Sequence, residues 1–168
     1  LFLALIMVVF MAGSAAAHGN ISKLPLPVQV LQYKMKLYMN ADDLDTINNL
    51  AMAYFYPGEM ANAKEQLGLI LEKDPHNFNA LDGMGMVYLK EKNGSNALEY
   101  LQKAQQINAN AMYLLVHLAV VHGMLGQGEL AGKEMNLAKS LSTGDDDMIW
   151  IENEIKILND PQEAGAAQ

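Results

Sequence analysis

The stretch NLAMAYFYPGEMANAKEQL, residues 49–67, places small and aromatic residues at fixed offsets around one glycine. Its first half has helical spacing and ends at Pro57-Gly58, after which a second helical pattern begins. Residues of the same kind return twice along the chain, at a period of 34. The aligned columns are Leu50, Met84 and Leu118; Ala51, Gly85 and Ala119; Tyr54, Tyr88 and His122; Ala63, Ala97 and Ala131; and Leu67, Leu101 and Met135. Five columns at one period indicate an internal repeat, which decides the architecture before any local motif does.

These columns resemble the tetratricopeptide-repeat (TPR) family, whose units are helix–turn–helix pairs of 34 residues. The resemblance covers about residues 44–145 as three units: 44–77, 78–111 and 112–145. Small residues in two columns let the paired helices approach closely, and larger residues in the others fill the space between pairs. The resemblance implies an all-α fold, a right-handed superhelical solenoid.

The turn between the two helices of a unit is expected to need a glycine. Gly58 and Gly126 fall at this column, where a positive φ costs glycine little. The second unit carries Lys92 there, with Gly94 nearby. This departure leaves the predicted fold unchanged.

The N-terminal end of the repeat array is predicted to be a capping half-repeat, residues 28–43. Its helical pattern matches the second helix of a preceding unit, because Tyr33 lies 34 positions before Leu67. Residues 18–27 read as a linker, polar at first and then broken by two prolines.

The C-terminal end is predicted to be a capping helix, residues 146–160, which closes the solenoid. Asp145 or Asp146 is the expected N-cap, and the acidic residues suit the positive end of the helix. Residues 161–168 are predicted to be a disordered tail. The apolar face of the capping helix consists of Met148, Ile151, Ile155 and Leu158.

The first 17 residues, LFLALIMVVFMAGSAAA, carry no charge and end in small residues. Ala15 and Ala17 are placed for cleavage, so we interpret residues 1–17 as a secretory signal peptide and expect a periplasmic or otherwise exported bacterial protein. The alternative is a retained signal anchor, which would tether the chain to the inner membrane, facing the periplasm. The apolar part, residues 1–12, is short for a bilayer crossing of about 20 residues.

Composition excludes several classes of function. The chain has no cysteine, so disulfides, thiolate metal sites and thiol nucleophiles are excluded. Its net charge is −8, with 19 acidic residues against 11 basic ones, which argues against a nucleic-acid surface. No glycine-rich phosphate loop and no nucleophile elbow are present. We therefore predict no enzymatic activity, no catalytic residues and no cofactor.

Each candidate metal ligand has a simpler interpretation. His117 and His122 are five residues apart on one predicted helix, which does not suit joint metal binding, and His122 occupies the aromatic column of the repeat. The acidic run at residues 145–147 lacks the spacing of a calcium loop. His18 would become the first residue after cleavage, but no second histidine is held beside it. We predict no metal site.

The concave face of a TPR array is built mainly from the first helix of each unit, and the resemblance projects its positions onto this chain. The carboxylate-clamp members of the family bind acidic C-termini through basic residues there, whereas this chain offers only Lys90 as a cation. An apolar, methionine-rich strip remains, which suits an adaptable protein interface. The predicted partner-binding residues are Asn48, Asn49, Met52, Phe55, Tyr56, Asp82, Met86, Leu89, Lys90, Tyr113, Val116, His117, Val120 and Met124.

We interpret the chain as a non-enzymatic scaffold or adaptor of the bacterial envelope, which binds an apolar or amphipathic segment of another envelope protein in this groove. Two alternatives remain: a structural protein that self-associates into a homo-oligomer, and a membrane-tethered accessory subunit of an envelope complex. The partner itself is not identified by the sequence.

Overall fold

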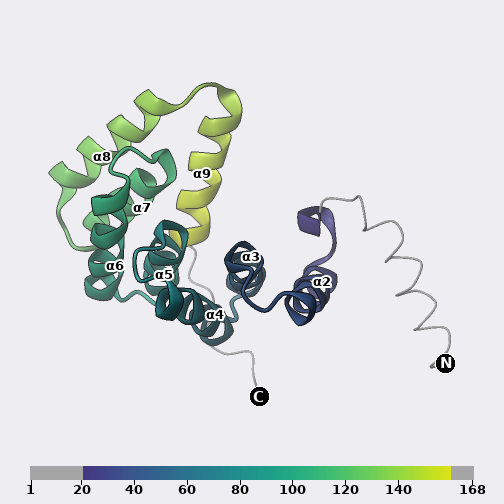
Figure 1. Cartoon of the computed structure of the whole chain (residues 1–168). Helices are drawn as coiled ribbons and strands as arrows, with labels where there is room; N and C mark the ends of the chain where they lie inside the picture. Colours follow the sequence, from purple (N-terminus) through teal and green to yellow (C-terminus); the bar gives the residue numbers. More distant parts are fainter. Residues whose placement is uncertain (1–20, 160–168) are drawn as a thin grey trace, which may run out of the picture.

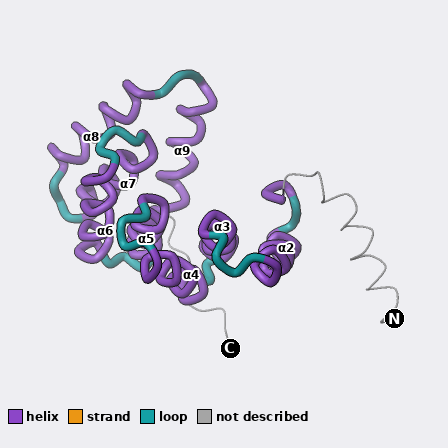
Figure 2. The backbone as a smooth tube through the Cα atoms, viewed as in Figure 1, coloured by secondary structure: helices purple, strands orange, loops and turns teal. Residues whose placement is uncertain are grey.

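The computed structural model describes residues 21–159; the predicted signal segment 1–17, the first residues of the linker and the tail 161–168 lie outside this range. The described part holds eight α-helices and no strand (Figure 2). None of these helices is long and apolar enough to cross a bilayer. The elements are a short 3-10 helix η1 (Ile21–Lys23), α2 (Leu26–Met39), α3 (Leu44–Phe55), α4 (Met60–Lys73), α5 (Phe78–Lys90), α6 (Gly94–Ile107), α7 (Met112–Met124), α8 (Gly128–Leu141) and α9 (Asp145–Asn159).

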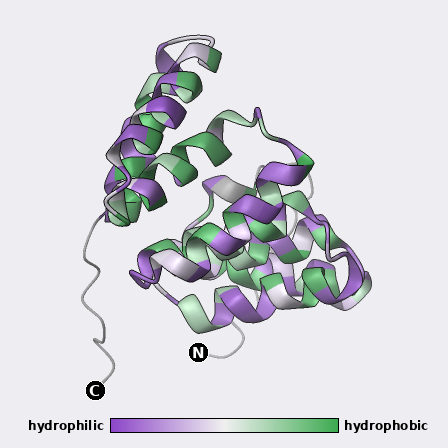
Figure 3. Ribbon diagram, turned by 90° about the vertical axis from the view of Figure 1, so that its left-hand side faces the viewer, coloured by the Kyte–Doolittle hydropathy of each residue, from purple (hydrophilic) through white to green (hydrophobic). Residues whose placement is uncertain are grey.

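The helices form three antiparallel pairs, α3 with α4, α5 with α6 and α7 with α8, and α2 packs against α3. Successive pairs follow one another along an arc, which Figure 1 shows running from α2 to α8. Most helices carry both hydrophobic and hydrophilic residues along their length (Figure 3), as expected where one face packs on a neighbour and the other meets water.

Polar side chains fix the start of the first helix in the first two units. The Asp43 carboxylate accepts a hydrogen bond from the backbone N–H of Thr46 at 3.1 Å. The Asn77 side-chain oxygen accepts one from the N–H of Ala80, also at 3.1 Å. Each bond satisfies a backbone donor that has no partner within the helix, which is worth about 1 kcal/mol.

The turn inside each unit adopts the same left-handed backbone in all three copies. Gly58 has φ 92°, Gly126 has φ 74°, and Lys92 has φ 58° at the corresponding position. The second unit therefore keeps the turn geometry without glycine, and a lysine accepts a conformation that L-residues disfavour.

The small-residue columns are the contact points of the paired helices. Ala51, Ala63 and Ala97 are completely or almost completely inaccessible to water. At Gly85, an added Cβ would lie 2.4 Å from a methyl carbon of Leu101, so only glycine fits between α5 and α6. Leu67 and Leu101 are fully buried beside these positions, and each such side chain contributes about 2 kcal/mol by its removal from water.

The last helix, α9, turns back from the end of α8 along the inner side of the arc (Figure 1). It packs mainly against α7 and α5. Its residues Ile151 and Leu158 are buried, while Met148 and Ile155 are half-buried. α9 therefore covers part of the concave side of the array.

The expected N-cap of this helix was wrong. Asp145 and Asp146 already lie within α9, which begins at Asp145. The stabilising carboxylate belongs to Asp147, which accepts hydrogen bonds from the Thr143 N–H at 2.7 Å and from the Thr143 hydroxyl at 2.9 Å. These bonds hold the pKa of Asp147 below its usual value.

Candidate interaction site

The predicted groove is the concave side formed by α3, α5 and α7, and α9 lies along part of it. An open cavity of about 370 Å³ remains between these four helices, which we call the groove cavity. The structure therefore brings six of the predicted partner-binding residues together around one space. The lining residues are Met52, Tyr56, Asp82, Met86, Tyr113 and His117, which the sequence predicted, and Met112, Trp150 and Glu154, which it did not.

The rim of this cavity is the part that a partner can reach. Tyr56 is 47% exposed and Tyr113 is 36% exposed. Met52 is half-buried, whereas Met86 is only 6% exposed and forms part of the floor. The rim is thus aromatic, and the methionine side chains form apolar walls inside it.

Three predicted partner-binding residues belong to the core instead. Phe55, Leu89 and Val116 are almost entirely buried. Val116 packs with Ala138 of α8 and Ile151 of α9. Their burial arises because the helices pack on more than one side, so a position on the first helix of a unit does not always face the groove.

Three further predicted residues, on α3 and α5, are not among those that line the groove cavity. Asn48 is half-buried and Asn49 is exposed, both on α3. Lys90 donates a hydrogen bond from Nζ to the backbone oxygen of Ile157 at 2.7 Å, which ties α5 to the end of α9. No observation tests whether these residues bind a partner, and their assignment stays a prediction.

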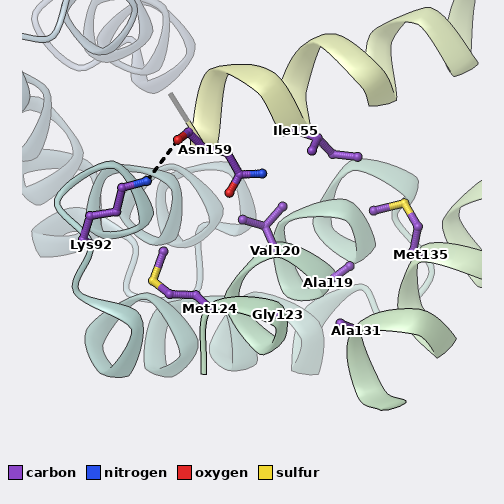
Figure 4. A pocket seen from close by; sticks show the side chains of 9 residues that line it. All are labelled: Lys92, Ala119, Val120, Gly123, Met124, Ala131, Met135, Ile155 and Asn159. Carbon is purple, nitrogen blue, oxygen red and sulfur yellow. Dashed lines mark hydrogen bonds between the residues drawn. The ribbon is translucent and has the colours of Figure 1, made fainter. Parts of the chain in front are cut away.

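Val120 and Met124 line a second cavity, of about 540 Å³, beneath the C-terminal half of α9. Figure 4 shows Ile155 and Asn159 of α9 above it and Met135 at its side. The second cavity means that α9 is packed incompletely on α7 and α8.

The floor of the groove cavity contains a buried cluster of three ionisable side chains, one from each of α5, α7 and α9. His117 Nδ1 lies 2.8 Å from Asp82 Oδ1, and His117 Nε2 lies 3.6 Å from Glu154 Oε1. All three side chains are buried. Among the described residues, no group of three or more His, Asp or Glu side chains is arranged to hold a metal ion.

The electrostatics of this cluster favour a protonated imidazole. Burial by itself would lower the pKa of His117, but the charge and hydrogen bond of Asp82, with a smaller effect from Glu154, outweigh it and raise the pKa to about 9. His117 is therefore a buried imidazolium that links two carboxylates at neutral pH.

His122 has a different environment from His117. Its Nδ1 lies 2.6 Å from Glu134 Oε2 of α8, and its ring is buried in the aromatic column of the repeat. The two histidines of α7 thus contact different carboxylates on different helices.

Sequence reasoning missed Trp150 and Glu154 because it treated the last helix as a cap. One signal was present: Glu154 follows Ile151 by three positions and precedes Leu158 by four, which places a carboxylate on the apolar face of that helix. An acidic residue at such a position needs a buried partner.

Comparison with known proteins supports the fold. No family model matches the chain. Among curated proteins, superkiller complex protein 3 of Homo sapiens is 28% identical over 74 residues; the match takes in 44% of this chain but only 5% of the human protein.

Solved structures cover more of the chain. A thermophilic TPR protein from Thermus thermophilus, TTC0263, aligns over 79% of this chain and 72% of its own, with a TM-score of 0.67 and 17% identity. MamA aligns over 79% of this chain and 76% of its own, with a TM-score of 0.61 and 20% identity. A TPR protein from Parabacteroides merdae aligns over 79% of this chain and 52% of its own, with a TM-score of 0.62 and 19% identity. The described residues therefore have the tetratricopeptide-repeat fold that the 34-residue columns predicted.

Proposed function

We propose that this chain is a non-enzymatic interaction scaffold whose concave groove binds an apolar or amphipathic segment of another protein. The observation that carries the proposal is the position of α9, itself an amphipathic helix, on α5 and α7 inside that groove. The groove already accommodates one helix of this kind through apolar contacts and buried charge. A partner segment of similar character would meet a compatible surface.

The groove cavity beside α9 supplies free surface for such a segment. Tyr56 and Tyr113 present aromatic rings at its rim, and aromatic residues are common anchors in protein interfaces. Methionines inside the cavity adapt their shape to different side chains.

An envelope location is part of this proposal and rests on the sequence of residues 1–17 alone. The partner would then be another envelope protein.

The test is crosslinking and affinity purification from native envelopes, comparing the wild-type chain with Tyr56→Ala. The matched control is Tyr38→Ala, because Tyr38 is 93% exposed on α2 and lines no described cavity. Met86→Glu is a poorer choice, since it would place a charge at a buried position and disturb the fold. We expect a distinct protein to be captured by the wild type and by the control, and lost with Tyr56→Ala. Recovery of the chain alone, in all three forms, would contradict the proposal and favour self-association.

A further inference from the structure

We propose that the groove cavity binds a protonated alkylamine, and that a lysine side chain of the partner segment supplies it. This inference rests on the proposed function and specifies the chemistry of the partner at one position.

The floor of the groove cavity carries more acidic than basic side chains. Asp82 and Glu154 contribute two negative charges, and the His117 imidazolium contributes one positive charge. Glu154 is only 3% exposed, and its Oε1 has no hydrogen-bond partner among the described residues. Buried charge is stable when it is paired. One surplus negative charge beside an open cavity therefore favours a cationic occupant.

The walls of the groove cavity suit an alkylammonium group. Tyr56, Tyr113 and Trp150 line the cavity, and the face of an aromatic ring attracts an ammonium group. The same contact occurs elsewhere in this chain, where Lys64 Nζ lies 5.4 Å from the ring centre of Tyr88. The methionine side chains add apolar surface for the four-carbon stem of a lysine. The Asp82, His117 and Glu154 side chains beside these walls are not arranged as a group that could hold a metal ion.

The carboxylates of the floor also act on the tyrosines of these walls. Burial and the charge of Glu154 raise the pKa of Tyr56, while burial and the charge of Asp82 raise the pKa of Tyr113. Both phenols lie at the rim, so each carboxylate of the floor acts on one aromatic residue of the opening.

The described lysines of the chain do not supply this cation. The 11 basic residues of the chain are all lysines, and all lie between Lys23 and Lys156. None of them lines the groove cavity. The described lysines therefore leave the groove cavity open to a lysine of a partner segment.

The experiment titrates the full chain with n-butylammonium chloride at constant ionic strength, and in parallel with n-butanol as the uncharged analogue. Trp150 is the one tryptophan of the sequence and lines the cavity, so its fluorescence reports occupancy directly. We expect a saturable change with the amine and none with the alcohol.

Two variants test the residues. Glu154→Gln is expected to weaken amine binding about tenfold, because the surplus charge is removed. Glu152→Gln is the matched control, since it makes the same change at an exposed position on the same helix. Tyr56→Leu, at a half-exposed position, is expected to weaken binding several-fold through loss of the ring face. Circular dichroism of each variant establishes that the helices are intact.

Equal responses to butanol and butylammonium would overturn the inference, as would no response to either. A response to tetramethylammonium without one to butylammonium would retain a cation site but overturn the assignment to lysine. Partner capture that depends on Tyr56 but is unchanged by Glu154→Gln and by excess butylammonium would overturn this inference while the proposed function stands.

Discussion

His117 of α7 lies 3.6 Å from Glu154 of α9, measured between Nε2 and Oε1, and both side chains are buried. The two residues are far apart in the sequence, and this contact connects the repeat array to the helix that lies in its groove. On its other side, His117 pairs with Asp82 at 2.8 Å. This cluster holds α9 together with the buried Ile151 and Leu158 and the Lys90 hydrogen bond to Ile157.

We predict that His117→Gln destabilises the folded chain by about 3 kcal/mol or more, because two buried carboxylates would then face each other without a cation. Glu154→Gln should lower the free energy of unfolding by less, about 1–2 kcal/mol, since the imidazolium keeps its pairing with Asp82. Urea unfolding measures both values. His76→Gln is the control, because His76 is exposed and should leave the free energy of unfolding unchanged. Equal costs for the two cluster variants would show that the histidine does not hold this cluster together.

The same cluster predicts a pH dependence. The pKa of His117 is about 9 in the folded chain against 6.5 for an unperturbed histidine, so the folded chain keeps a proton that the unfolded chain releases. The contribution to stability is complete below pH 6.5, falls as the pH rises, and is lost above about pH 9. The pKa difference makes the contribution of His117 to the free energy of unfolding roughly 3 kcal/mol. We expect the free energy of unfolding to decline between pH 7 and pH 9.5 in the wild type and to decline much less in His117→Gln. Parallel pH profiles for the two proteins would contradict this assignment.

Glycine substitutions test the helix contacts of the repeat. Gly85→Ala should destabilise the chain by about 1–3 kcal/mol, because the new methyl group would overlap Leu101 of α6. Gly132→Ala is the matched control in α8, where a Cβ would meet no atom within 4 Å; we expect it to stabilise the chain by up to about 1 kcal/mol. Thermal unfolding followed by circular dichroism distinguishes the two. A gain of stability from Gly85→Ala would show that α5 and α6 are not in close contact.

The turn at Lys92 allows a backbone effect to be separated from a side-chain effect. Lys92 has φ 58°, and its Nζ donates a hydrogen bond to the backbone oxygen of Leu158 at 3.2 Å. Lys92→Gly and Lys92→Ala both remove that bond, but only glycine relieves the left-handed backbone. Lys92→Gly should therefore be about 1 kcal/mol more stable than Lys92→Ala in urea unfolding. Equal stabilities would mean that the turn relaxes to another conformation.

Much of the fold follows from local patterns in the sequence. The columns of Ala51, Ala63 and Leu67 recur at one period because the two helices of each unit pack on one another in the same way. Neighbouring units also contact one another in the same way. This regularity predicted the all-α repeat architecture and the turn at Gly58. The resemblance to the TPR family, which places the concave face on the first helix of each unit, predicted six of the nine residues around the groove cavity.

The sequence determined which residues are apolar, where each helix pairs with the next, and that the last helix has one apolar face. The tertiary structure alone decided where that face is placed. Its position on α5 and α7, rather than as a cap on the end of α8, depends on contacts between residues far apart in the chain, such as Glu154 with His117 and Lys90 with Ile157. Periodicity describes only how a helix meets its neighbours in the sequence. It carries no information about which distant surface buries a charge or an apolar stripe at the lowest free energy, and that choice sets the shape and the charge of the groove cavity.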